Sequence, residues 1–166
     1  MVEIKEQQIE KIWTALYDVK DPEIPVISVV DLGIIVKIVM DEGAKATVTM
    51  TPTFTGCPAI DYMKEEIQAK VAGLDFVNQA EVIVDFSEAW TSDRISDKGK
   101  DQLKNFGLAP PVKHGGKVDM AAISKVSCPN CGSADTTLNT PFGPTLCRSI
   151  HFCFNCKEGF EGFKPI

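Results

Sequence analysis

Long apolar runs and basic residues are both scarce in this sequence. No apolar run in the 166 residues approaches the ~20 needed to span a bilayer, and the polar N-terminus does not resemble a signal peptide. We therefore expect a cytoplasmic protein with no membrane partner. In that compartment, six cysteines point to metal or thiol chemistry rather than to disulfides.

The charge balance is acidic. Lys and Arg number 17 against 23 Asp and Glu, a net charge of −6. Residues 126–166 contain three of each sign, so the whole excess lies in residues 1–125. Because a nucleic-acid binder needs clustered basic residues to displace counterions from phosphates, nucleic acid is not expected as a partner.

Hydrophobic periodicity predicts an α+β fold in which a small mixed sheet packs with helices. Helices are expected at 4–17, 58–72 and 95–106, and strands at 34–40, 45–51 and 80–86. The expected domains are 1–107, a Pro- and Gly-rich linker or arm at 108–125, and 126–166. The apolar segment from Trp90 to Pro111 is expected to pack on the N-terminal domain.

Cys57 lies far in sequence from the other five cysteines. It is followed by Pro58 and an amphipathic helix, and proline suits a first helical turn because its missing N–H needs no partner there. Cys57 is thus expected at or beside the N-cap, where the helix dipole favours a thiolate that binds metal or attacks electrophiles. The alternative is a small buried residue in a tight turn.

Three acidic residues, Asp21, Glu23 and Asp31, lie in an apolar, proline-containing loop that ends at Gly33. Either they cap turns through bonds to the backbone, or they lie near Cys57 and shape its site. Beside Cys57 they would oppose a thiolate, since like charges disfavour ionisation, but they would favour iron. The hypothesis is a site that transiently binds iron or an iron–sulfur cluster.

Residues 126–166 contain two Cys-x2-Cys pairs separated by 21 residues: Cys128 with Cys131, and Cys153 with Cys156. Two such pairs form a tetrahedral four-sulfur site typical of structural zinc. Strands are expected at 135–140, 146–152 and 160–163, which makes this segment a zinc ribbon. Because so short a segment builds too small a core, the metal is expected to supply folding energy.

Cys147 and His151 remain outside this set. Cys147 is expected to pack on a strand face, with a second ligand role or a reactive thiol as alternatives. His151 is expected on the strand surface, since four cysteines already fill the site. The surplus of phenylalanine suggests a docking face for another protein; the residues are Phe152, Phe154, Phe160 and Phe163.

Several motifs together resemble the PaaD (also called PaaJ) family, accessory subunits of the bacterial phenylacetyl-CoA epoxidase system. They are Asp21-Pro-Glu23, Asp31-Leu-Gly33, Thr51-Pro-Thr-x-x-Gly-Cys57-Pro58, Trp90-Thr-x-Asp-Arg-Ile-Ser96 and Gly107-Leu-Ala-Pro-Pro111. Residues 1–90 alone resemble the wider SufT-like family of iron–sulfur assembly factors, and the appended ribbon narrows the resemblance. It implies an α+β sandwich whose reactive thiol is Cys57.

The resemblance also implies a function, which is to mature or assemble the iron–sulfur or diiron centres of a multicomponent epoxidase in phenylacetate degradation. Implied partners are the diiron hydroxylase subunit or the iron–sulfur flavin reductase, together with iron–sulfur assembly machinery. The alternatives are a zinc-ribbon adaptor without metal transfer and a Cys57-dependent thiol enzyme. An enzyme is less expected because the two histidines, His114 and His151, are distant from Cys57 in sequence.

Overall fold

The computed structural model describes residues 2–166, with side chains from Ile4 onward. The chain divides into two compact units, the first ending at Trp90 and the second spanning Thr91–Ile166. Across the described residues, no helix combines the length and apolar character that a membrane crossing requires.

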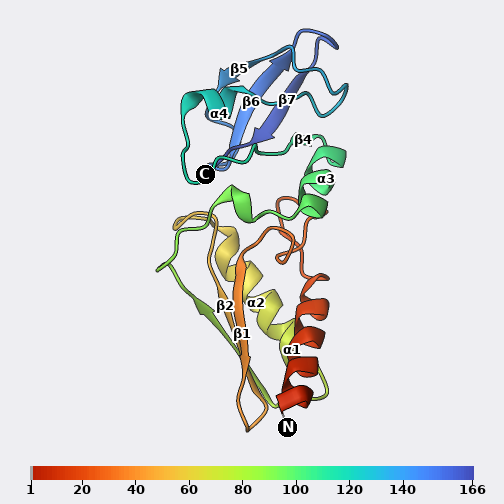
Figure 1. The fold of residues 1–166 in the computed structure, drawn as a ribbon, viewed down its shortest axis with the longest axis vertical. Coiled ribbons are helices and arrows are strands. Elements are labelled where there is room, and N and C mark those ends of the chain that lie inside the picture. The colour runs from red at the N-terminus through yellow and green to blue at the C-terminus, as the bar shows by residue number, and fades with distance from the viewer. Residues whose placement is uncertain (1) are drawn as a thin grey trace. The chain divides into compact units, whose positions relative to one another are not determined.

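The first unit is a three-stranded mixed sheet with two helices (Figure 1). Its elements are α1 (Val2–Leu16), β1 (Ile35–Met40), β2 (Lys45–Met50), α2 (Ala59–Ala72) and β3 (Gln79–Val84). The strand order is β1-β2-β3, with β1 and β2 antiparallel and β2 and β3 parallel. The expected α+β fold is confirmed, and every element lies within two residues of its predicted bounds.

One face of this sheet is covered by the helices. Burial alternates along β2 because successive strand side chains point to opposite faces, while α1 contacts β1 and α2 contacts β3 (Figure 1). The buried side of α2 has helical spacing and consists of Ala59, Met63, Ile67 and Val71. This packing fixes the end of β2 and the start of α2, and Cys57 lies between them.

The second unit contains a four-stranded sheet in the order β4-β7-β6-β5. Its elements are η1 (Ser92–Arg94), α3 (Asp97–Asn105), β4 (Leu108–Ala109), α4 (Met120–Ser124), β5 (Thr136–Thr140), β6 (Arg148–Cys153) and β7 (Gly159–Phe163). The three expected ribbon strands are present. The short β4 and α4 were not predicted, because two and five residues carry no periodic signal.

The division between the units differs from the expected boundary after residue 107. Residues 91–107 cluster with the second unit, and α3 contacts β4. Leu108 and Ala109, expected in a linker, instead pair with Glu161 and Gly162 of β7. Proline and glycine mark where a chain turns, but they do not indicate that two residues between turns join a sheet.

Trp90 begins the segment that was expected to pack on the first unit. Trp90 itself does pack there, because its indole N–H donates to Leu32 O at 3.1 Å.

A glycine in the β5–β6 loop provides a test of the ribbon packing. A Cβ added at Gly143 would lie 2.8 Å from the backbone carbon of Arg148, and the Gly143 N–H donates to Arg148 O at 2.9 Å. Gly143→Ala should therefore lower the free energy of unfolding of the second unit by about 1–3 kcal/mol. Hydrogen exchange of β5 and β6 amides in the full chain measures this change.

Gly159→Ala is the matched control. A Cβ at Gly159 would meet His151 O at an ordinary contact distance of 3.7 Å. It should change stability by less than about 0.5 kcal/mol. Equal losses for the two variants would contradict the argument from close packing.

Candidate functional site

Three loops meet at one end of the first sheet. Leaving β2, Thr51 donates its N–H to Ile34 O at 2.8 Å, just before β1 begins, and its hydroxyl to Glu88 O at 3.0 Å. The Asp85 N–H, following β3, donates to Met50 O at 2.9 Å. The loop that carries Cys57 is therefore bonded at its start to the segments before β1 and after β3.

Cys57 lies immediately before the N-cap of α2. Pro58 is the N-cap, with φ −66° and ψ −17°, one position earlier in the helix than predicted. The Cys57 N–H donates to Phe54 O, and Cys57 O accepts from the Ile60 N–H, both at 3.2 Å. The side chain is partly exposed, and the cysteine forms no disulfide. The turn therefore bonds both backbone groups of Cys57 and leaves the residue partly exposed.

Two of the three candidate carboxylates bond to their own loop. Asp21 Oδ1 accepts the backbone N–H groups of Glu23 and Ile24 at 2.8 and 2.9 Å. Asp31 is buried, and its Oδ2 accepts the Ser28 hydroxyl at 2.8 Å while Ser28 Oγ accepts the Asp31 N–H at 2.9 Å. Glu23 is exposed. For Asp21 and Asp31 these contacts favour the turn-capping interpretation.

These residues do not converge on a metal position. Three or more His, Cys, Asp or Glu side chains that lie close enough together can hold one metal ion. In the described part of the chain, the ribbon's four cysteines form such a group. Cys57, Asp21, Glu23 and Asp31 form no such group. Their site-shaping role therefore stays a hypothesis.

The four ribbon cysteines lie on two turns of the same design. In the first, the Gly132 N–H donates to Cys128 O at 2.8 Å, and Gly132 has φ +74°. In the second, the Lys157 N–H donates to Cys153 O at 3.0 Å, and Lys157 has φ +62°. Each turn thus ends in a left-handed residue directly after its second cysteine, and it presents both sulfurs to the same side.

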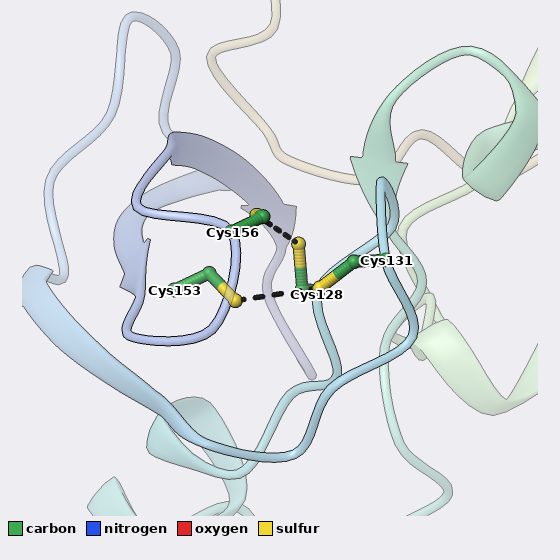
Figure 2. Close-up of side chains that lie close together, drawn as sticks. All are labelled: Cys128, Cys131, Cys153 and Cys156. Atoms are coloured by element: carbon green, nitrogen blue, oxygen red, sulfur yellow. Dashed lines mark hydrogen bonds between the residues drawn. The ribbon is translucent and has the colours of Figure 1, made fainter.

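The sulfur geometry fits a tetrahedral metal ion. All four Sγ atoms lie within 4.8 Å of one another, and Figure 2 shows them pointing toward a common centre. Cys128 and Cys156 are 3.7 Å apart, and Cys131 and Cys153 are 3.6 Å apart. Four sulfurs at ~2.3 Å from zinc would be separated by about 3.8 Å. The cluster is therefore consistent with a zinc ribbon.

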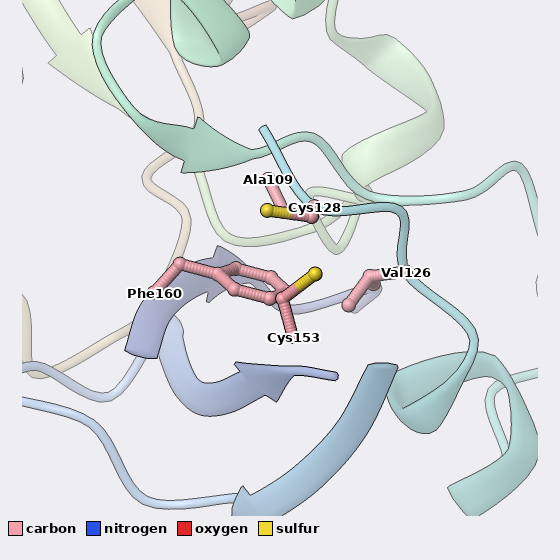
Figure 3. Packing of buried hydrophobic residues seen from close by; sticks show 5 residues of the cluster. All are labelled: Ala109, Val126, Cys128, Cys153 and Phe160. Atoms are coloured by element: carbon pink, nitrogen blue, oxygen red, sulfur yellow. The ribbon is translucent and has the colours of Figure 1, made fainter. Parts of the chain in front are cut away.

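Burial differs among the four cysteines. Cys128 and Cys153 are fully buried in a core with Ala109, Val126 and Phe160 (Figure 3), whereas Cys131 is exposed and Cys156 partly buried. The two buried cysteines therefore belong to the core as well as to the cluster.

Hydrogen bonds make the outer two sulfurs inequivalent. The side chain of Asn155 and the backbone N–H of Ser133 lower the pKa of Cys131 to about 6. For Cys156, the backbone N–H of Glu158 acts to lower the pKa, but burial and bonds with the other cysteines raise it to about 12. Cys131 is therefore the more acidic of the two outer thiols.

The remaining ribbon residues have structural partners. Cys147 lies outside the cluster, with its sulfur 3.1 Å from the Thr145 hydroxyl. His151 is fully buried, which corrects its expected surface position. It stacks on Phe160 at 5.3 Å and bonds Ser149 Oγ through Nε2 at 2.8 Å. Gly162 allows this packing, because a Cβ there would lie 3.0 Å from Nε2.

Sequence analysis missed a polar junction that includes His114. Its side chain is 2% exposed, and its Nε2 lies 3.2 Å from Ser92 Oγ. Nδ1 accepts the Gly116 N–H at 3.1 Å, so the neutral ring carries its hydrogen on Nε2 and cannot take the Ser92 proton there. Ser92 also bonds the backbone of Ile166. The junction joins distant segments of the second unit and is not a nucleophile–base pair.

Comparisons with known proteins agree with this organisation. Residues 9–84 match the family described as iron-sulfur cluster assembly protein, and residues 113–164 match the PaaD zinc beta ribbon domain. The chain is 34% identical over 159 residues to a putative 1,2-phenylacetyl-CoA epoxidase subunit of Escherichia coli strain K12, across 96% of this chain and 94% of that protein. This chain belongs to the PaaD family. The resemblance drawn from its motifs is confirmed.

The PaaD-family chain also has shorter relatives. A Fe-S protein maturation auxiliary factor of Porphyromonas gingivalis is 36% identical over 97 residues, covering 58% of this chain and 91% of its own length. The crystal structure of a domain of unknown function, DUF59, from Bacillus anthracis has a TM-score of 0.59 at 29% identity, covering 62% of this chain and 97% of that one. The iron–sulfur assembly domain therefore lies in the first unit, to which the PaaD chain adds the ribbon.

The turn-capping interpretation of Asp31 predicts a stability effect. Asp31→Ala leaves the buried Ser28 hydroxyl without its acceptor, so the first unit should lose about 1–3 kcal/mol of unfolding free energy. Urea unfolding followed by tryptophan fluorescence reports on this unit, because Trp13 and Trp90 both belong to it. Glu42→Ala, at an exposed turn position, is the control. An Asp31→Ala protein as stable as the control would contradict a structural role.

Proposed function

We propose that this protein is an accessory factor that matures or assembles the metal centres of a multicomponent phenylacetyl-CoA epoxidase. The iron–sulfur or diiron centre is its cargo, and Cys57 is the thiol that handles it. The partners would be the oxygenase subunits, either the diiron hydroxylase or the iron–sulfur flavin reductase, together with iron–sulfur assembly machinery.

The observation that carries this proposal is the combination of matches along one chain. The relative named as an epoxidase subunit aligns over 96% of the chain, and within that span residues 9–84 match an iron–sulfur assembly family. A domain shared with maturation factors, joined to a ribbon found in the epoxidase system, supports a maturation factor dedicated to that enzyme.

The geometry of Cys57 supports its role in transfer. The thiol is partly exposed at a turn whose backbone bonds are satisfied, directly before α2. An accessible thiol can take a metal ion or cluster from one protein and release it to another without opening the fold. The bonds of Thr51 to Ile34 O and Glu88 O hold the start of this loop in place.

Two alternatives make different use of the same residues. In an adaptor, the ribbon would dock on the epoxidase and Cys57 would be only structural. In a thiol enzyme, Cys57 would need a base, but both histidines lie in the second unit and bond to serines there: His114 to Ser92 and His151 to Ser149. These contacts favour the two non-enzymatic functions.

For the ribbon we propose structural zinc held by Cys128, Cys131, Cys153 and Cys156. Four cysteines saturate a tetrahedral ion and leave no open position for chemistry, which is the arrangement of structural rather than catalytic zinc sites. The burial of two ligands in the core supports a folding role.

Replacement of one ligand tests the zinc proposal. Wild-type protein should contain about one zinc per chain. Cys128→Ser should lose the metal and unfold the ribbon while the first unit stays folded, as read by metal analysis and by exchange of β6 and α2 amides. Cys147→Ser is the matched control, because Cys147 is a ribbon cysteine outside the cluster. Retention of metal by Cys128→Ser would refute the assignment.

The Cys57→Ala variant distinguishes a maturation factor from an adaptor. The variant deletes one partly exposed side chain, so fold and ribbon metal should be unchanged. In a strain without the native copy, it should nevertheless fail to support growth on phenylacetate, and the epoxidase subunits purified from that strain should contain less iron. Cys147→Ala should complement normally.

Co-purification with the epoxidase subunits completes this experiment. Under the maturation proposal, Cys57→Ala still binds its client but leaves it short of iron. Full complementation by Cys57→Ala would support the adaptor instead. If the alanine variant proves unstable, Cys57→Ser answers the same question with a side chain of nearly the same size.

A further inference from the structure

The two ribbon turns have matching backbones but not matching surroundings. The first cysteine of each turn, Cys128 and Cys153, is fully buried. The second cysteines differ, since Cys131 is exposed whereas Cys156 is partly buried. The four-sulfur site therefore has one side open to solvent, and Cys131 forms it.

A side chain from the opposite turn reaches this open sulfur. Asparagine occupies the same position in both turns, as Asn130 in the first and Asn155 in the second, in each case directly before the second cysteine. Asn155 Nδ2 donates to Cys131 Sγ at 3.6 Å. Asn130 makes no such bond to sulfur in the described structure. Asn130 and Asn155 therefore occupy equivalent sequence positions but make different contacts.

An N–H donor changes the chemistry of a metal-bound thiolate. The donor withdraws negative charge from the sulfur and fixes the orientation of the ligand. Groups that hydrogen-bond to metal ligands in this way contribute strongly to metal affinity. Cys131 also receives a backbone N–H from Ser133, as Cys156 does from Glu158. The Asn155 bond is therefore what distinguishes the exposed sulfur from its counterpart in the other turn.

We propose that Asn155 is a positioning residue for the ribbon metal, and that Cys131, which it holds, is the ligand through which the site opens to metal exchange and to thiol-directed electrophiles. The bond joins the two turns directly, so it holds the exposed ligand of the first turn against the second turn. The inference rests on the proposed zinc site and adds to it an order of ligand release.

Two readouts on the full-length, zinc-loaded chain test the proposal. Zinc affinity is measured by competition with a chromogenic chelator. The order of modification is measured by brief treatment with iodoacetamide and mass spectrometry of the peptides. Cys147, outside the cluster, reports the reactivity of a ribbon thiol that is not a cluster ligand in the same sample.

Asn155→Leu removes the donor and keeps a side chain of similar size, and Asn130→Leu is its matched control. Asn155→Leu should bind zinc about 10–100-fold more weakly and should be alkylated faster at Cys131, while Asn130→Leu should match wild type in both. Cys131 should be the first of the four cluster cysteines modified in every sample. Should Asn155→Leu fail to fold, Asn155→Asp, which puts a carboxylate beside the thiolate, should show the same loss of affinity.

Three results would overturn this inference. Equal zinc affinities for Asn155→Leu, Asn130→Leu and wild type would remove the role of Asn155. First modification at Cys128, Cys153 or Cys156 would remove the role of Cys131. Wild-type protein that binds no zinc would overturn the zinc proposal itself. This outcome is distinct from failure of the inference about Asn155 and Cys131, because it is measured on wild type before any variant is compared.

Discussion

The close approach of four sulfur atoms is the constraint on which the second unit depends. Thiolates within 4.8 Å of one another repel, by about 4 kcal/mol for two unit charges 4 Å apart at an effective dielectric constant of 20. A divalent cation removes this repulsion and supplies bonding in its place. Because Cys128 and Cys153 are also core residues beside Phe160, an ion that neutralised the cluster would also hold the core together. Under the zinc proposal, folding and metal binding are therefore one process in this unit.

The first unit is stabilised by different means. Its helices bury apolar residues such as Ile12 and Ile67 against a sheet, and hydrophobic burial of this kind needs no metal. The loop before α2 is fixed by that packing and by Thr51, which bonds the segments before β1 and after β3. Cys57 therefore lies on a scaffold that is stabilised without a metal. In the proposed function, a transfer thiol would benefit from this, since binding and release of cargo would leave its support unchanged.

Periodicity and cysteine spacing predicted most of the fold, because both are local properties of the sequence. The helix from Ala59 and the four-cysteine cluster are examples. What could not be predicted depends on contacts between distant residues. The pairing of β4 with β7 involves two residues, and the burial of His151 depends on Gly162 of a neighbouring strand. Likewise, the sequence left open whether Asp31 capped a turn or joined a site, and the bond to Ser28, which favours capping, is visible only in three dimensions.

The two cysteine sites differ in what they can do with a metal. Four thiolates complete a tetrahedral shell, so the ribbon can hold an ion but cannot pass it on without releasing a ligand. A single thiolate at Cys57 leaves most of a shell empty, so any cargo bound there requires ligands from elsewhere. Within its own unit, Asp21 and Asp31 already bond their loops. In the proposed function, the missing ligands would therefore come from the donor and then from the client. Transfer would follow because the cargo is never fully coordinated by this protein alone.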